Sequence, residues 1–163
     1  VLAETEYLPE EAAEVEAPPP VEQRIVTLRL AAPPLERFGG TDLVEALRAA
    51  GLEHGKFSIF HKTTPDGATL FSVASLVEPG TFDLEQIAGR RFAGVSLFAV
   101  LPGPLEATAI LEDMIASGRK MAERLQGILQ DERGAAMTPQ RLADLRASIV
   151  DWQRRAAGAR SRN

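Results

Sequence analysis

The sequence predicts a domain that combines a small antiparallel β-sheet with α-helices covering one of its faces. Four strand-like runs, at residues 24–31, 56–62, 69–77 and 95–102, are apolar on both alternating faces. The neighbouring helix-like segments each carry one apolar stripe, so they can cover only one side of the sheet. A small antiparallel sheet normally has one polar, solvated face. The second apolar face therefore predicts an interaction surface, covered either by this chain or by a partner.

Side-chain alternation divides the strand residues into two sets that point to opposite faces. The first set is Val26, Leu28, Leu30, Phe60, Phe71, Val73, Val77, Val95, Leu97 and Leu101. The second set is Ile25, Phe57, Ile59, Leu70, Ala74, Leu76, Phe98 and Val100. An apolar second face is typical of a binding module rather than of an enzyme.

Composition and charge narrow the class of protein. The 163 residues are 45% hydrophobic and 25% charged, which is typical of a globular domain with a real core. The absence of cysteine excludes disulfides and thiolate chemistry. Residues 1–23 hold seven acidic residues and no basic one, which leaves residues 24–163 with a net charge of about +2. A nearly neutral domain does not indicate nucleic-acid binding.

Residues 1–23 are rich in Glu, Ala and Pro and are expected to be the end of a flexible linker. The three consecutive prolines at 18–20 favour an extended polyproline II conformation. Because the chain begins with Val1, we expect a longer protein, whose upstream part could contain a targeting or membrane segment. No run of 18 or more apolar residues is present in the 163 residues.

The first strand, 24–31, is expected to end at Pro33-Pro34, and a helix follows Gly39-Gly40 with Thr41 as its N-cap. This helix ends at Gly51. Strands 56–62 and 69–77 form a hairpin, because the Thr-Pro-Asp-Gly segment between them is a strong turn signal.

A short helix at 83–88 precedes the strand at 95–102, and a long helix runs from Pro104 to Leu125. Gly127–Gln130 is a further strand, and Thr138-Pro139 begins the last helix. That helix has an apolar stripe that ends in Trp152, which is expected to anchor the core. The folded domain is therefore predicted over residues 24–156, with residues 157–163 as a disordered basic tail.

Catalytic and metal-binding patterns are absent from the sequence. His54 and His61 are its only histidines, and no nucleophile, glycine-rich phosphate loop or metal-ligand spacing accompanies them. We therefore expect a structural role for His61, and we expect no enzymatic activity, no cofactor and no bound metal.

Several segments resemble one known family. They are Lys-Phe-Ser-Ile-Phe-His at 56–61, Thr-Pro-Asp-Gly at 64–67, residues 69–83 and Met-Thr-Pro-Gln-Arg-Leu at 137–142. Together they resemble the C-terminal, FtsZ-binding domain of the bacterial cell-division protein ZipA, and the resemblance runs from about Ile25 to Trp152. The stretch from Leu70 to Asp83 is its most specific part.

The resemblance implies an α+β fold, with a mostly antiparallel sheet of five to six strands and about three helices on one face. It also implies an exposed hydrophobic groove on the other face that binds the C-terminal tail of FtsZ. Carried over position by position, the partner-binding residues are Ile25, Thr27, Phe57, Ile59, Ala74, Leu76, Ser96 and Phe98. Glu78 stands where the family commonly has a lysine, and Arg133 matches an arginine at the edge of the groove.

The implied function is that of a non-catalytic adaptor, monomeric as an isolated domain. It would tether FtsZ filaments to the cytoplasmic side of the inner membrane at the division site, through an N-terminal anchor that lies upstream of this chain. Three alternatives stay open. The second face could be covered by the long helix or by a second copy, it could bind another division protein, or its aromatic residues could stack RNA bases.

Overall fold

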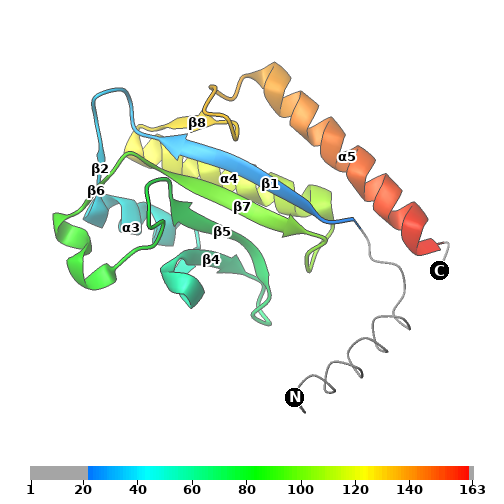
Figure 1. The fold of residues 1–163 in the computed structure, drawn as a ribbon, viewed down its shortest axis with the longest axis horizontal. Coiled ribbons are helices and arrows are strands. Elements are labelled where there is room, and N and C mark those ends of the chain that lie inside the picture. Colours follow the sequence, from blue (N-terminus) through cyan, green and yellow to red (C-terminus); the bar gives the residue numbers. More distant parts are fainter. Residues whose placement is uncertain (1–21, 162–163) are drawn as a thin grey trace, which may run out of the picture.

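A six-stranded antiparallel sheet forms the centre of the fold (Figure 1). The computed structural model describes residues 22–161. The strand order is β3-β4-β5-β7-β1-β8, and every neighbouring pair is antiparallel. The strands are β1 (Arg24–Ala31), β3 (Glu53–His54), β4 (Phe60–Thr63), β5 (Thr69–Ser75), β7 (Gly94–Leu101) and β8 (Ile128–Gln130). The α+β class predicted from the sequence is confirmed.

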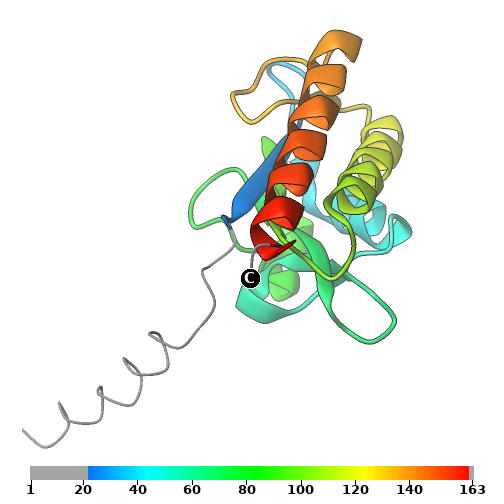
Figure 2. The ribbon, with the colours of Figure 1, turned by 90° about the vertical axis from the view of Figure 1, so that its right-hand side faces the viewer.

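Three α-helices lie among the described residues: α3 (Gly40–Ala49), α4 (Ala107–Leu125) and α5 (Pro139–Ser161). Helices α3 and α4 lie on one side of the sheet, and α5 runs alongside α4 next to β1 (Figure 2). Two 3₁₀ helices, η1 (Lys56–Ser58) and η2 (Leu84–Gly89), lie before β4 and after β5. A separate two-stranded ribbon pairs β2 (Phe38–Gly39) with β6 (Arg91–Phe92).

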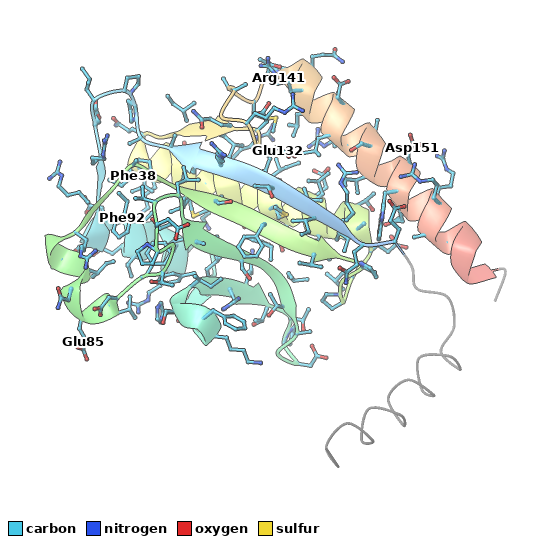
Figure 3. All side chains as sticks on the ribbon, in the orientation of Figure 1. Phe38, Glu85, Phe92, Glu132, Arg141 and Asp151 are labelled. Carbon is cyan, nitrogen blue, oxygen red and sulfur yellow. The ribbon has the colours of Figure 1, made fainter. Side chains whose placement is uncertain are left out.

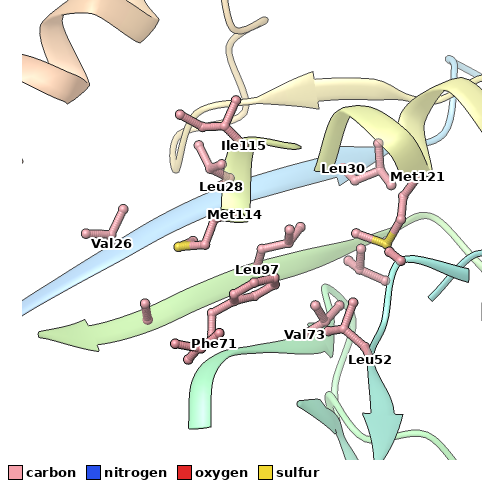
Figure 4. Packing of buried hydrophobic residues seen from close by; sticks show 14 of the residues in the cluster. Val26, Leu28, Leu30, Leu52, Phe71, Val73, Leu97, Met114, Ile115 and Met121 are labelled. Atoms are coloured by element: carbon pink, nitrogen blue, oxygen red, sulfur yellow. The ribbon is translucent and has the colours of Figure 1, made fainter. Parts of the chain in front are cut away.

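The core lies between the sheet and α4. Nine of the ten residues in the first alternating set are buried, and they pack against Met114, Ile115 and Met121 of α4 (Figure 4). The exception is Val77, which is 57% exposed because β5 ends at Ser75 and the alternation stops there. The long helix therefore covers the first face of the sheet, and the alternative in which it covers the second face is wrong.

Several predicted boundaries are corrected by the structure. Gly39, not Thr41, is the N-cap of α3, and no side chain caps that end. The short helix after β5 is 3₁₀ rather than α, with the Asp83 carboxylate accepting from the Glu85 N–H at 3.1 Å. Helix α4 begins at Ala107 rather than at Pro104.

The two ends of the chain are only partly described. Helix α5 continues to Ser161, so residues 157–161, predicted as part of a disordered tail, are helical. Residues 162–163 and residues 1–21 of the predicted linker lie outside the described residues.

The predicted strand 56–62 is the largest error. Phe57 and Ser58 have φ angles of 62° and 58°, in the left-handed region, and they form η1 instead of a strand. The pairing begins only with β4, at Phe60. Two bonds from elsewhere in the fold hold η1 in place: Nε2 of His61 lies 2.9 Å from the Lys56 carbonyl, and the Phe82 N–H donates to the Ser58 carbonyl at 2.8 Å.

Helix α5 is attached to the rest of the fold by Trp152 and by a pair of charged side chains. Trp152 is 4% exposed, and its indole N–H donates to the Glu22 carbonyl at 3.0 Å, as expected for a core anchor. Arg146 of α5 donates two hydrogen bonds to Glu112 of α4, at 2.7 and 2.9 Å. These bonds lower the pKa of the Glu112 carboxyl from its ordinary value.

The Arg146→Met variant is expected to lose stability in a pH-dependent way. A pKa that is lower in the folded state contributes stability above the unfolded value, 4.5 for this glutamate, and that contribution is lost as the pH falls through the folded value. Urea unfolding should show the variant less stable than the original chain at pH 7, with the difference shrinking towards pH 3. The control is Arg154→Met, whose partner Asp151 lies on the same helix. A difference that stays constant from pH 7 to pH 3 would contradict this role for Glu112.

Candidate functional site

Apart from Phe57, the residues of the second alternating set lie on or next to the face of the sheet that points away from α3 and α4, towards the viewer in Figure 1. No helix of residues 22–161 covers this face, which we call the outer face. Ile25 is 59% exposed and Val100 is 46% exposed, although both are large apolar residues in neighbouring strands. Soluble domains rarely leave a contiguous apolar surface of this kind uncovered unless it binds something.

Strand register brings the residues of the outer face into rows. Thr27 of β1 and Ser72 of β5 both lie opposite Phe98 of β7, and His61 of β4 lies opposite Ser72. The next row places Ser96 between Arg29 and Ala74. Phe98 is therefore at the centre of the outer face, where it is half-buried by its neighbours.

A shallow hollow of about 190 Å³ lies beside Phe98. Leu70, Ser72 and Val100 line it together with Phe98, and Leu70 is only 7% exposed. The hollow thus combines the buried Leu70 with the half-buried Phe98 and the exposed Val100. Leu70 and Val100 were in the second alternating set but not among the residues carried over from the family, so alternation alone identified them.

Leu76 continues the outer face beyond the end of β5. The Leu76 N–H donates to the Gly94 carbonyl at 3.1 Å, which keeps the chain beside β7. A Cβ atom at Gly94 would lie 2.8 Å from Cδ1 of Leu76 and 2.6 Å from the Leu30 carbonyl oxygen. Only glycine fits there, and its lack of a side chain lets Leu76 lie over the sheet at this end of the face.

Ile59 and Phe57 differ sharply in exposure. Ile59 is 8% exposed and adds little accessible surface, whereas Phe57 is 80% exposed. Phe57 lies in η1 at the edge of the sheet, not on the strand that the sequence predicted. A large aromatic residue held in a left-handed conformation and exposed to solvent is a costly arrangement that is often found at functional positions.

Replacing Phe57 with glycine is expected to leave the free energy of unfolding within about 1 kcal/mol of the original value. Glycine removes the left-handed strain but raises the conformational entropy of the unfolded chain, and the two effects oppose each other. Chemical denaturation measures the change. Ile59→Gly is the control and should be destabilising by several kcal/mol, because it removes a buried side chain. A large destabilisation by Phe57→Gly would mean that Phe57 has a packing role.

His61 has polar contacts that explain its position. Its Nδ1 lies 2.7 Å from the Ser72 hydroxyl and its Nε2 lies 2.9 Å from the Lys56 carbonyl. A carbonyl can only accept, so Nε2 carries a hydrogen. No carboxylate is hydrogen-bonded to this ring within the described part of the chain, and both ring nitrogens hold structure together. The predicted structural role of His61 agrees with this geometry.

The loop after β8 forms the rim beside β1. Oδ1 of Asp131 accepts from the N–H groups of Ala135 and Arg133, each at 2.9 Å, and these bonds lower the pKa of Asp131. The bonds fix the loop that carries Arg133, which is exposed. Figure 3 labels Glu132 and Arg141 at this rim. A hollow of about 210 Å³ lies between Thr27, Met137 and Leu145, which sequence reasoning did not connect.

Two kinds of feature are absent from the described residues, 22–161. No group of three or more metal-ligating side chains lies together in them. None of their helices is both long and apolar enough to cross a membrane.

Comparison with known proteins gives one consistent result. A family model described as "ZipA, C-terminal FtsZ-binding domain" matches residues 24–148. The cell division protein ZipA of Azotobacter vinelandii is 36% identical over 140 residues, which cover 84% of this chain and 49% of that protein. ZipA of Ectopseudomonas mendocina is 33% identical over 150 residues, covering 90% and 55%. The chain therefore spans about half the length of these curated relatives.

Proposed function

Because this chain belongs to the family of ZipA C-terminal, FtsZ-binding domains of bacterial cell-division proteins, we propose that its outer face binds the C-terminal tail of FtsZ. The binding residues are those carried over from the family, namely Ile25, Thr27, Phe57, Ile59, Ala74, Leu76, Ser96 and Phe98, with Leu70 and Val100 added. The interaction makes and breaks no covalent bond and needs no cofactor.

The uncovered apolar surface around Phe98 is the observation that carries this proposal. Most of the proposed binding residues lie on one face, and the register of four strands fixes the positions of Thr27, Ser96 and Phe98 within it. A peptide with apolar residues at helical spacing can place them along such a face and bury them. Phe57, at the edge, would contact one end of the peptide.

The consequence for the cell is tethering of FtsZ filaments at the division site. The relatives are about twice as long as this chain, so the rest of such a protein has room for a linker and a membrane anchor. In this proposal the domain works on the cytoplasmic side of the inner membrane. Weak single contacts suit this task, because many anchored domains bind many tails of one filament.

Titration of a fluorescently labelled FtsZ C-terminal tail peptide tests the proposal. We expect a Kd in the micromolar range, about −8 kcal/mol, because the hollow beside Phe98 is shallow and the apolar residues of a bound peptide would stay partly exposed. Sedimentation of the free domain at the same concentrations should give the mass of a monomer. A peptide that does not bind a well-folded monomer would refute the FtsZ proposal. A dimer that buries the outer face would favour self-association instead.

A further inference from the structure

A second hollow, of about 310 Å³, opens beyond the Leu76 end of the outer face. Three arginines line it, Arg37, Arg90 and Arg91, together with Val77 and the single acidic residue Glu78. We call it the arginine hollow. Phe92, labelled in Figure 3, also lines it and marks its place beside the ribbon of β2 and β6.

The β2–β6 ribbon brings Arg37 beside Arg90 and Arg91, from which it is far apart in the sequence. Arg37 directly precedes β2, and Arg91 lies opposite Gly39 in the ribbon. The Gly40 N–H also donates to the Arg90 carbonyl at 2.9 Å. The backbone around all three arginines is therefore held by the ribbon, and three like charges line one hollow.

None of the three guanidinium groups forms an ion pair with a described residue. Arg37 donates to the carbonyl of Glu36 at 2.8 Å, a neutral acceptor. All three arginines are exposed, so they are accessible to a ligand. With Glu78 as the one acidic lining residue, the lining has a net charge of +2.

The arginine hollow adjoins the Leu76 end of the outer face along two strands of the chain. Leu76, which closes the outer face, is followed directly by Val77 and Glu78 of the hollow. On the other strand Ala93 of the hollow is followed by Gly94, and the Ala32 N–H donates to the Ala93 carbonyl at 2.8 Å. A peptide that extends past Leu76 at this end of the outer face therefore comes within reach of the residues that line the hollow.

We propose that the arginine hollow binds acidic residues that flank the apolar segment of the partner peptide. This inference rests on the proposed function, and it adds the charge and the direction of the peptide. Guanidinium groups bind carboxylates with charge-assisted, often bidentate hydrogen bonds. Charges at the rim of an interface mainly set register, orientation and the association rate. Because the hollow lies at one end only, it selects one direction of the bound peptide.

Three labelled peptides test this inference with the intact chain. All three contain the same apolar segment of an FtsZ tail. The first peptide has four glutamines on each side of this segment. The second has glutamates in place of the glutamines on the N-terminal side, and the third has them on the C-terminal side. One glutamate peptide should bind about tenfold more tightly than the glutamine peptide, or about 1.4 kcal/mol, and the other should show no gain. The gain should disappear in Arg90→Gln/Arg91→Gln and shrink at high salt.

The matched control is Arg48→Gln/Lys120→Gln, which removes the same charge from exposed positions on α3 and α4. It should keep most of the gain. Three results would each overturn the inference: an equal gain in affinity from both glutamate peptides, no gain from either, or a gain that survives in Arg90→Gln/Arg91→Gln. In each of these cases, binding of the glutamine peptide would leave the proposed function intact. If no peptide binds the original chain, the proposed function and this inference both fail.

Discussion

Replacing Phe98 with glutamate is expected to weaken binding of the FtsZ tail peptide by about 100-fold or more, with little loss of stability. Phe98 lies at the centre of the outer face, beside a hollow lined by Leu70. Central aromatic residues of an interface often contribute about 2 kcal/mol or more to binding. The glutamate would also carry a charge into an apolar contact, which adds a desolvation cost.

Anisotropy titration measures the loss of binding, and thermal melting shows that the variant is folded. Val150→Glu is the control, because Val150 is an exposed apolar residue on α5 and the charge change is the same. It should bind like the original chain. If Phe98→Glu melts cooperatively and still binds with the original affinity, the outer face is not the site.

The second large predicted effect is on the free energy of unfolding, which should respond very differently to alanine substitution at two adjacent residues of β7. Leu97→Ala is expected to cost about 3–4 kcal/mol of the free energy of unfolding, because Leu97 is fully buried against α4. Phe98→Ala should cost about 1 kcal/mol, because Phe98 points to the opposite face and is only half-buried. The comparison uses one strand, so the local backbone is the same for both.

Urea unfolding at two protein concentrations measures both variants. Equal losses for the two residues would mean that both faces of the sheet are covered. A loss for Phe98→Ala that grows with protein concentration would identify a second copy as the cover. A monomeric domain with an uncovered outer face predicts a large, concentration-independent difference between the two variants.

The bounds of helices and strands were predicted best where they depend on residues close together in the sequence. Strand β1 was predicted with its observed bounds, because its apolar residues alternate without interruption and Pro33-Pro34 follows. The start of α5 was also predicted, since the Thr138 hydroxyl accepts from the Arg141 N–H at 3.1 Å, as an N-cap does.

Prediction failed where distant contacts decide the backbone. The residues before β4 alternate like a strand, but His61 and Phe82 hold Phe57 and Ser58 in a 3₁₀ turn. Residues 157–161 look like part of a polar tail, yet the last helix continues past Ala156, which is 5% exposed and packs in the core, to Ser161. Neither contact can be read from a sequence window.

The candidate site was partly predictable for the same reason. Alternation placed Ile25, Phe98 and Val100 on one face, because period 2 is a property of a single strand. It could not tell that Thr27 and Ser72 flank Phe98, since that depends on the order of the strands. The arginine hollow was not predictable at all, because a two-residue ribbon unites its arginines.

The most direct test of the outer face is to map the peptide on the domain by NMR. A ¹⁵N-labelled chain is titrated with the unlabelled FtsZ tail peptide, and the shift of each backbone amide is followed. We predict the largest shifts in β1, β5 and β7, around Thr27, Ala74 and Phe98, and small shifts in α3 and α4. Shifts concentrated instead in the hollow between Asp42 and Arg124, on the helical side, would contradict binding at the outer face.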